Sequence, residues 1–428
     1  MYGSILSQIT PESLPFNLEL LPKPAYLVGG AVRDAILGRT REYLDLDFIL
    51  PTEAVNVARK IAKYHQAGFV LLDAQRQIAR VVFPDATVDI AQLEGDSLKT
   101  DLPRRDFTIN AIAYNIHTQE IIDPLQGRAD LFKGIVRMIS PANLEDDPLR
   151  LIRGYRQAAQ LGFDIEAQTR STIRALAFHL EKVASERIRV ELGYMLANSQ
   201  GTPWLIKAIE DGLLKSSFKY ATSQSCILLA EVDKVAAQLT ENFPTLREIL
   251  QKYIRDTVKT TQLGIAKLAC LVNPKPDIAE VELEQLTYSR AEIQAVTTAL
   301  RLFPKLQVPL ISLREQYFLF QEAGCVFPTT NILAVAYGNV VEEMSEDKSL
   351  TTYASLLARY LNPDDPVAHP TQLVSGKHII SSLNIPSSPL IGRLLTEIAV
   401  AQVESKISTF DEAIEFARKL VEENGYGE

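Results

Sequence analysis

The sequence of 428 residues has little cysteine and little histidine, and neither residue type is grouped. Its three cysteines, Cys226, Cys270 and Cys325, are odd in number and far apart, which argues against a disulfide framework and against a zinc site. The five histidines form no His-Asp doublet and no H-x-x-x-H pair, so a histidine-based hydrolase is disfavoured as well. We therefore assign the cysteines and histidines structural or surface roles.

Long apolar runs and an excess of positive charge are also absent. No run approaches the roughly 18 residues of a membrane span, and no signal-like segment stands out, so we expect a soluble cytoplasmic protein without a membrane partner. The formal net charge of −9 disfavours a protein that coats nucleic acid indiscriminately, although it leaves room for a local basic groove. The length favours two or more domains.

A paired-glycine turn is the most informative feature that the sequence does contain. Residues 26–28 read as a buried strand, Gly29 and Gly30 turn the chain, and Arg33 lies in the short helix after the turn. A turn of this kind lets backbone N–H groups approach a polyphosphate at the start of a helix. An isolated pair of glycines is more often a simple turn, so the interpretation depends on the motifs further along the chain.

Two aspartates lie on the next predicted strand, residues 44–50. Asp45 and Asp47 stand at i and i+2, so their carboxylates face the same side and can bind Mg²⁺ ions that bridge a nucleoside triphosphate and a 3′-hydroxyl. Asp89, between apolar neighbours on a strand predicted over residues 87–92, is a candidate third catalytic carboxylate. The alternatives are a solvated strand edge for the pair and an outward-facing strand residue for Asp89.

The next motif packs two arginines, an acid and an amide before an apolar run. Arginine forks suit triphosphate oxygens, so Arg105 is a candidate nucleotide-binding residue, and Asp106 and Asn110 can orient it. Taken alone, the motif also fits a salt-bridge cluster at a helix N-terminus. Its value comes from its place downstream of the glycine turn and the aspartate pair.

The last motif opens a helix with acids at its N-terminus and a proline in its first turn. Asp147 and Arg150 stand at i and i+3, on one face of that helix. An acid can accept from the exocyclic amine of C or A and repel the carbonyl of U or G, while an arginine donates to a ring nitrogen. Arg153 and Arg156 follow Asp147 and Arg150 along the helix and are candidates for contacts with phosphates. A surface salt bridge is the alternative interpretation.

The apolar periodicity changes along the chain. Over the first 140 or so residues, short β-like runs mix with helices such as the amphipathic segment 54–65, which predicts an α/β or α+β head. From about residue 144 onward the spacing is almost entirely helical, punctuated by prolines. The proline-rich segment 362–370 is the best candidate for a linker to a small C-terminal helical unit.

Four motifs in this order resemble those of the class II tRNA nucleotidyltransferase and bacterial poly(A) polymerase family, within the polymerase β-like nucleotidyltransferases. They are the glycine turn with the aspartate pair, the segment 104–111, the turn at 123–131, to which we give mainly a structural role, and the segment 146–156. The resemblance covers residues 25–192 and includes a further motif at residues 185–192, after the helix with Asp147 and Arg150. It implies an α+β fold with a catalytic head followed by helical domains. The implied domains are a nucleotidyltransferase head over residues 1–140, a nucleotide-selecting neck over 141–200, a body over 201–362 and a tRNA-binding tail over 371–428.

The resemblance also implies roles for the candidate residues. Gly30, Arg33 and Arg105 would bind the triphosphate, and Asp45 and Asp47 would bind Mg²⁺. Asp147 and Arg150 would be a protein template for C and A, supported by Arg153 and Arg156. The expected partners are the 3′ end of tRNA, ATP and CTP. The full set of nucleotide-binding candidates is Gly29, Gly30, Arg33, Arg105, Asp106, Asn110, Asp147, Arg150, Arg153 and Arg156.

Two departures from the family pattern bear on the site and its product. Where the family usually has Glu-Asp-x-x-Arg, this chain has Asp146 and Asp147 before Arg150. The segment 92–103 is compact, whereas enzymes that add all of CCA usually carry a longer flexible loop here. The shortening resembles relatives that stop after CC, so the sequence leaves open whether CCA, CC, A or poly(A) is added.

The leading hypothesis is an enzyme that uses CTP, ATP or both, with Mg²⁺, to extend the 3′ end of tRNA without a template. A poly(A) polymerase is an alternative with the same chemistry. A non-catalytic RNA-binding protein is an alternative of another class, although the intact Asp45 and Asp47 argue against it. The sequence leaves both a monomer and a homodimer open.

Overall fold

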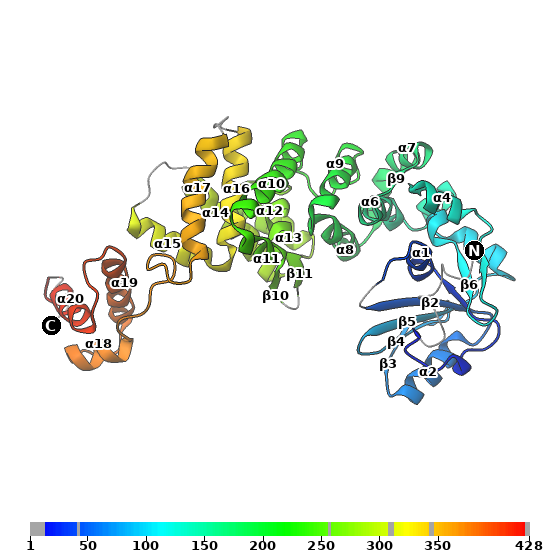
Figure 1. Cartoon of the computed structure of the whole chain (residues 1–428), viewed down its shortest axis with the longest axis horizontal. Helices are drawn as coiled ribbons and strands as arrows, with labels where there is room; N and C mark the ends of the chain where they lie inside the picture. The colour runs from blue at the N-terminus through cyan, green and yellow to red at the C-terminus, as the bar shows by residue number, and fades with distance from the viewer. Residues whose placement is uncertain (1–12, 41–42, 256–257, 307–311, 342–345, 424–428) are drawn as a thin grey trace. The chain divides into compact units, whose positions relative to one another are not determined.

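The computed structural model describes residues 13–40, 43–255, 258–306, 312–341 and 346–423 (Figure 1). Its contacts divide the chain into two units. One comprises Met1–Leu192 and Glu210–Ser216, and the other comprises Gly193–Ile209 and Ser217–Glu428. The four-part division into head, neck, body and tail stays a prediction.

A seven-stranded mixed sheet dominates the first unit, with strand order β3-β4-β5-β2-β1-β6-β7. Strands β2 and β5 pair in parallel, and the other neighbours pair antiparallel. Together with the many helices, this sheet confirms the predicted α+β fold class. The strands are β1 (Tyr26–Val28), β2 (Leu44–Leu50), β3 (Gly68–Asp73), β4 (Ile78–Val82), β5 (Ala86–Gln92), β6 (Ala113–Asn115) and β7 (Glu120–Ile122).

The sheet has one apolar and one polar face over β2, β4 and β5. Helix α2 (Ala54–His65), helical as predicted, packs against β3, β4 and β5. Leu46 and Phe48 are buried on β2. Because side chains alternate along a strand, Asp45 and Asp47 occupy the opposite face. Helix α1 (Gly30–Ile36) starts directly after β1 and contacts β2.

Helices continue the first unit after the sheet. They are α3 (Leu98–Asp101), α4 (Gly127–Lys133), α5 (Pro141–Asp146), α6 (Leu149–Leu161), α7 (Ala167–Leu176) and the start of α8 (Ser185–Leu196), with the short strands β8 (Ile135–Val136) and β9 (Asp164–Ile165) between them. The helix predicted to open with the acids before Pro148 differs from this. Helix α5 ends at Asp146, Asp147 is extended, and Pro148 caps the start of α6, because the residue before a proline disfavours helical backbone.

The second unit is built around an apolar helix, α16 (Phe327–Val341). It contacts α10, α12, α14 and α17, so nearly its whole surface is covered. Residues 313–341 are long and apolar enough to cross a membrane. However, 67% of the most apolar 18-residue stretch in this range is buried inside the protein, as in the core helix of a globular domain. The other helices are α9 (Thr202–Glu210), α10 (Ser223–Asn242), α11 (Pro244–Gln251), α12 (Gln262–Ala269), α13 (Pro276–Gln285), α14 (Arg290–Leu306), α15 (Leu313–Ala323) and α17 (Glu346–Leu361), with a hairpin of β10 (Tyr253–Arg255) and β11 (Val258–Thr261).

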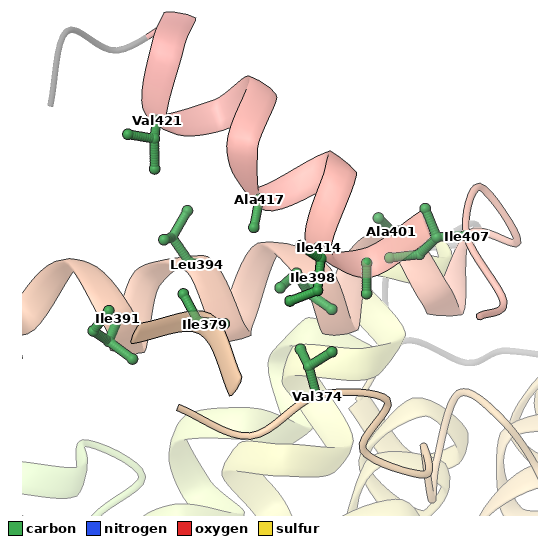
Figure 2. Close-up of a cluster of buried hydrophobic side chains, with 11 residues drawn as sticks. Val374, Ile379, Ile391, Leu394, Ile398, Ala401, Ile407, Ile414, Ala417 and Val421 are labelled. Carbon is green, nitrogen blue, oxygen red and sulfur yellow. The ribbon is translucent and has the colours of Figure 1, made fainter. Parts of the chain in front are cut away.

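The last three helices of the unit, α18 (Gly376–Leu383), α19 (Pro389–Val403) and α20 (Phe410–Glu423), share an apolar cluster of their own (Figure 2). Ile379, Leu394, Ile398 and Ala417 lie in it. An ion pair between Arg314 of α15 and Glu397 of α19 adds a polar contact to the rest of the unit. The three helices thus share an apolar core in which side chains from each of them are buried.

We expect Gly127→Ala to destabilise the protein. A Cβ at Gly127 would lie 2.2 Å from the carbonyl oxygen of Thr108 and 2.9 Å from the side chain of Ile112, so α4 would have to move. Overpacking of this kind costs about 2–3 kcal/mol in the free energy of unfolding, which urea unfolding of the full chain measures.

The control for this prediction is Gly193→Ala. Gly193 lies in α8, and a Cβ there meets no atom within 4 Å. Because alanine favours the helix over glycine by about 1 kcal/mol, stability should stay the same or rise. Equal stability of Gly127→Ala and the natural chain would contradict the proposed backbone contact.

Candidate active site

A cavity of about 320 Å³ opens on the polar face of the sheet. Strand β2, the turn before α1, the segment after η3 (Leu102–Arg104) and helix α6 all contribute to its wall. All the predicted site residues line it except Asp89, Asp147 and Arg150. Those in the wall are Gly29, Gly30, Arg33, Asp45, Asp47, Arg105, Asp106, Asn110, Arg153 and Arg156.

The glycine turn brings the backbone directly against the aspartates. Gly29 caps α1 with φ of 72°, a left-handed conformation that favours glycine. A Cβ at this position would lie 3.1 Å from Oδ2 of Asp47 and 3.5 Å from Nη1 of Arg105. Glycine is therefore required here both by the backbone angle and by the close approach to the Asp47 carboxylate.

The two aspartates of β2 differ in their surroundings. Asp45 is exposed, and its Oδ1 accepts a hydrogen bond of 2.8 Å from the Thr87 hydroxyl. Burial raises the pKa of Asp47 to about 6; the positive charge of Arg105 opposes this rise, and the negative charges of Asp45 and Asp89 add to it. A buried carboxylate among other acids is stabilised by a bound cation, so this oxygen-donor pair fits a divalent metal ion.

Asp89 lies beside Asp47 but is engaged elsewhere. In the parallel pairing of β2 with β5, Asp47 is the register partner of Asp89. Both Asp89 oxygens accept from the Arg80 guanidinium, at 2.7 and 2.8 Å. Within the described ranges, no group of three or more acidic, histidine or cysteine side chains is arranged to hold a metal ion. The structure thus places the predicted third carboxylate in an ion pair.

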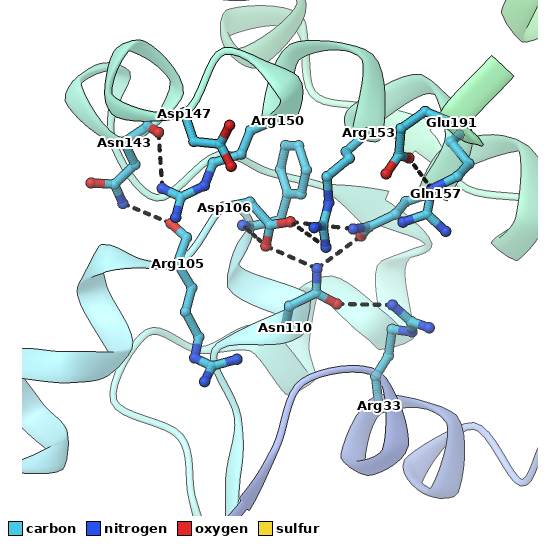
Figure 3. A network of polar contacts seen from close by, with 12 residues as sticks. Arg33, Arg105, Asp106, Asn110, Asn143, Asp147, Arg150, Arg153, Gln157 and Glu191 are labelled. Carbon is cyan, nitrogen blue, oxygen red and sulfur yellow. Dashed lines mark hydrogen bonds and ion pairs between the residues drawn. The ribbon is translucent and has the colours of Figure 1, made fainter. Parts of the chain in front are cut away.

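A buried polar network connects the segment after η3 to α1 and α6 (Figure 3). At its centre, Nδ2 of Asn110 donates to Asp106 and to Gln157, each at 3.0 Å, while Oδ1 of Asn110 accepts from Arg33 at 2.9 Å. Arg153 lies 3.2 Å from the other oxygen of Asp106. Three separate segments are therefore held together in the cavity wall.

The electrostatics of this network favour an ionised acid. Burial alone would raise the pKa of Asp106, but the Arg153 charge and the hydrogen bonds from Asn110 and from the backbone N–H of Phe107 hold it below its ordinary value. The buried Nε atoms of Arg105 and Arg153 have no hydrogen-bond partner in the part of the chain that the structure describes. Both arginines line the cavity, where their guanidinium groups bring positive charge to the site of an anionic ligand.

Asp147 and Arg150 lie outside the cavity wall in this structure. Asp147 pairs with Arg187 of α8 at 3.1 Å. Nη1 of Arg150 donates to the carbonyl oxygens of Arg104 and Asn143, each at 2.9 Å. Asp147 therefore pairs with Arg187 rather than with Arg150, and its role towards the base stays a prediction.

Arg156 lines the cavity and also pairs with Glu191 of α8, while donating to Gln160 at 2.6 Å. Its side chain thus joins two helices of the first unit. To bind phosphate as well, the Arg156 guanidinium would have to donate to the ligand while it stays paired with Glu191.

Several side chains that line the cavity or contact the candidate residues were not among the site residues predicted from the sequence. Gln157 lies one helical turn after Arg153, and this i, i+4 spacing on the helix is a signal that could have found it. Thr87, Arg80 and Arg187 reach Asp45, Asp89 and Asp147 only through strand pairing or helix packing. No local pattern predicts those contacts.

Three families match successive parts of the chain. Residues 25–137 match the Poly A polymerase head domain, residues 162–224 match the probable RNA and SrmB-binding site of polymerase A, and residues 256–417 match tRNA nucleotidyltransferase domain 2. The matches run in the order of the predicted head and helical regions.

Relatives match the chain over nearly its whole length. The CC-adding tRNA nucleotidyltransferase of Synechocystis sp. is 45% identical over 411 residues, which cover 96% of each chain. The CC-adding tRNA nucleotidyltransferase of Geobacter sulfurreducens is 30% identical and covers 92% of this chain and 91% of its own. The A-adding tRNA nucleotidyltransferase of Deinococcus radiodurans is 26% identical, with 94% and 96% covered.

Solved structures share the fold. A CCA-adding enzyme in complex with CTP has a TM-score of 0.68 at 23% identity and covers 95% of this chain and 91% of its own. The Thermotoga maritima CCA-adding enzyme complexed with tRNA has a TM-score of 0.67 at 22% identity, with 93% and 91% covered. By the length and identity of the sequence matches, the chain belongs to the CCA-adding tRNA nucleotidyltransferase family, metal-dependent enzymes that add nucleotides to the 3′ end of tRNA without a template.

Proposed function

We propose that this enzyme is a CC-adding tRNA nucleotidyltransferase, which transfers cytidine nucleotides from CTP to the 3′ end of tRNA with Mg²⁺ and stops after CC. The observation that carries the proposal is the 45% identity, over 96% of both chains, to a relative named for CC addition. A second relative with that name is 30% identical over more than nine-tenths of both chains.

The segment 92–103 supports the same proposal. It is folded tightly between β5 and η3: the backbone N–H of Glu94 donates to the Asp101 carboxylate at 3.1 Å, and the Glu94 carboxylate pairs with Arg104 at 2.6 Å. Leu98 and Leu102 anchor it in an apolar cluster with Val28. A short segment fixed in this way lacks the length of the flexible loop that accompanies full CCA addition in the family.

The cavity groups fit nucleotidyl transfer. We assign Asp45 and Asp47 to Mg²⁺, which when bound would lower the pKa of the tRNA 3′-hydroxyl and neutralise charge on the triphosphate. The Gly29 and Gly30 turn can approach the triphosphate with backbone N–H groups. Arg105 lines the cavity, and its guanidinium can donate to phosphate oxygens.

We further propose that the Asp147 carboxylate and the Arg150 guanidinium read the base. In the structure Oδ2 of Asp147 is held by Arg187, and Arg150 is held by two carbonyl oxygens through a single nitrogen, Nη1. Each side chain therefore has polar atoms outside these contacts with which it can address a base. Base reading requires a small rearrangement in which both side chains turn towards the cavity.

Two broader assignments rest on the same reaction. We place the enzyme in the cytoplasm, since its substrates are tRNA and nucleoside triphosphates and its three cysteines are free thiols. We also propose that the helical second unit binds tRNA, because a transferase that recognises only the 3′ end would not need so long a helical region.

Single-nucleotide extension tests the proposed function. Three tRNA transcripts, lacking CCA, ending in C and ending in CC, are incubated with Mg²⁺ and either CTP or ATP, and the products are resolved on a sequencing gel. Addition of C to the first two transcripts and no addition of A supports the proposal. Addition of C and also of A to the CC-ended transcript would make it a CCA-adding enzyme, addition of A alone to the CC-ended transcript an A-adding enzyme, long A tails a poly(A) polymerase, and no extension a binding protein.

We expect Asp47→Asn to abolish CTP incorporation while the protein stays folded. The substitution removes the charge that would hold the metal and keeps the shape of the side chain, so the loss should be at least about 10³-fold in turnover. Asp85→Asn, in the exposed turn between β4 and β5, is the matched control and should leave turnover unchanged. Substantial turnover by Asp47→Asn would remove Asp47 from the metal site.

We expect Asp147→Asn to weaken discrimination between CTP and UTP. An asparagine amide can donate to the carbonyl of uracil that a carboxylate repels, so the ratio of incorporation should fall by about tenfold or more. Asp146→Asn removes a neighbouring exposed acid and should leave the ratio unchanged. An unchanged ratio in Asp147→Asn would show that another group reads the base.

A further inference from the structure

One row of side chains crosses four strands of the sheet on its polar face. Strand pairing places Val70 of β3 opposite Arg80 of β4, Arg80 opposite Asp89 of β5, and Asp89 beside Asp47 of β2. Residues in one such row point to the same face. The ion pair of Arg80 and Asp89 is therefore the immediate neighbour of the carboxylate assigned to the metal.

The geometry of the ion pair leaves Asp89 little freedom. Arg80 Nε and Nη2 each donate to a different oxygen of Asp89, so the pair is bidentate. The Asp89 side chain is only 18% exposed, which makes its charge costly without a partner, while Arg80 is 39% exposed. Each oxygen of Asp89 thus accepts a hydrogen bond from Arg80, and a metal ion bound by Asp89 would lie next to the positive charge of that guanidinium.

We propose that Arg80 is a positioning residue that sets the metal affinity of the catalytic site: it neutralises Asp89 and limits the carboxylates available to the metal to Asp45 and Asp47. This inference rests on the proposed metal-binding role of those two aspartates. Arg80 acts through Asp89 and through the local charge, and it touches neither substrate nor the reacting atoms.

If this proposal holds, the affinity of the site for a divalent cation should follow the net charge that Arg80 and Asp89 contribute in each variant. Replacing Arg80 by Gln adds one unit of negative charge beside Asp47, replacing Asp89 by Asn removes one, and the double replacement restores the original balance. Other charged groups at the site, such as Arg105, are the same in every variant. Affinity for a divalent cation should rise with the negative charge, because the neighbouring groups act on the cation over a short distance.

The experiment is Mn²⁺ binding to the full chain without nucleotide or tRNA, followed by the electron paramagnetic resonance of free Mn²⁺. We expect Arg80→Gln to tighten binding by about five- to tenfold and Asp89→Asn to weaken it by a similar factor. The double variant should bind as the natural chain does. Arg80→Lys keeps the charge and should also restore natural affinity, which a purely structural role of Arg80 would not produce.

Two controls separate the possible failures. Arg76→Gln makes the same chemical change at an exposed arginine in the turn of the same hairpin and should leave binding unchanged. A double Asp45→Asn and Asp47→Asn variant should lose the Mn²⁺ site. If this double variant still binds Mn²⁺ as the natural chain does, the proposed metal site is wrong, and so is the inference about Arg80.

If the metal site is confirmed and Arg80→Gln binds Mn²⁺ as the natural chain does, only the inference about Arg80 is overturned. It is also overturned if the double variant of Arg80 and Asp89 binds far more weakly than the natural chain, because Asp89 would then be a ligand itself. Thermal unfolding of each variant confirms that binding is measured on folded protein.

Discussion

The buried carboxylate of Asp106 is the constraint on which the site depends. An ionised acid that is almost fully buried is stable only when charged and hydrogen-bonding groups surround it. Here those groups come from two segments far apart in the sequence: Asn110 lies one turn along the same segment, while Arg153 and Gln157 come from α6. The contacts of Asp106 thus hold α6, which carries Arg153 and Arg156, against the segment that carries Arg105.

The sheet supplies a second level of order. Its apolar face is buried under α2, so alternation along each strand places every charged residue of β2, β4 and β5 on the other face. Asp45, Asp47, Asp89 and Arg80 share this face without any contact specific to catalysis being required to put them there. The same two-residue period thus builds the apolar core and places the carboxylates of the proposed metal site on one face.

The sequence predicted the parts of the site that depend on local pattern. The strand at 26–28, the strand at 44–50 and the glycine turn between them are as expected, because alternation, glycine and helix periodicity are local signals. The helix predicted to begin at the acids before Pro148 begins only after that proline, since the proline disfavours helical backbone at the residue before it. The partners of Asp45, Asp89 and Asp147 depend on register and packing between distant segments, which no local pattern contains.

The ion pair of Arg80 and Asp89 also bears on how the first unit folds. These two residues are nine positions apart and meet across a hairpin, whereas Asp47 reaches Asp89 only through the parallel pairing of β2 with β5, 42 positions apart. Contacts close in sequence form at a smaller entropic cost than distant ones. We therefore expect the charge of Asp89 to be neutralised before β2 arrives with two more carboxylates, so that the strand docks on a neutral neighbour.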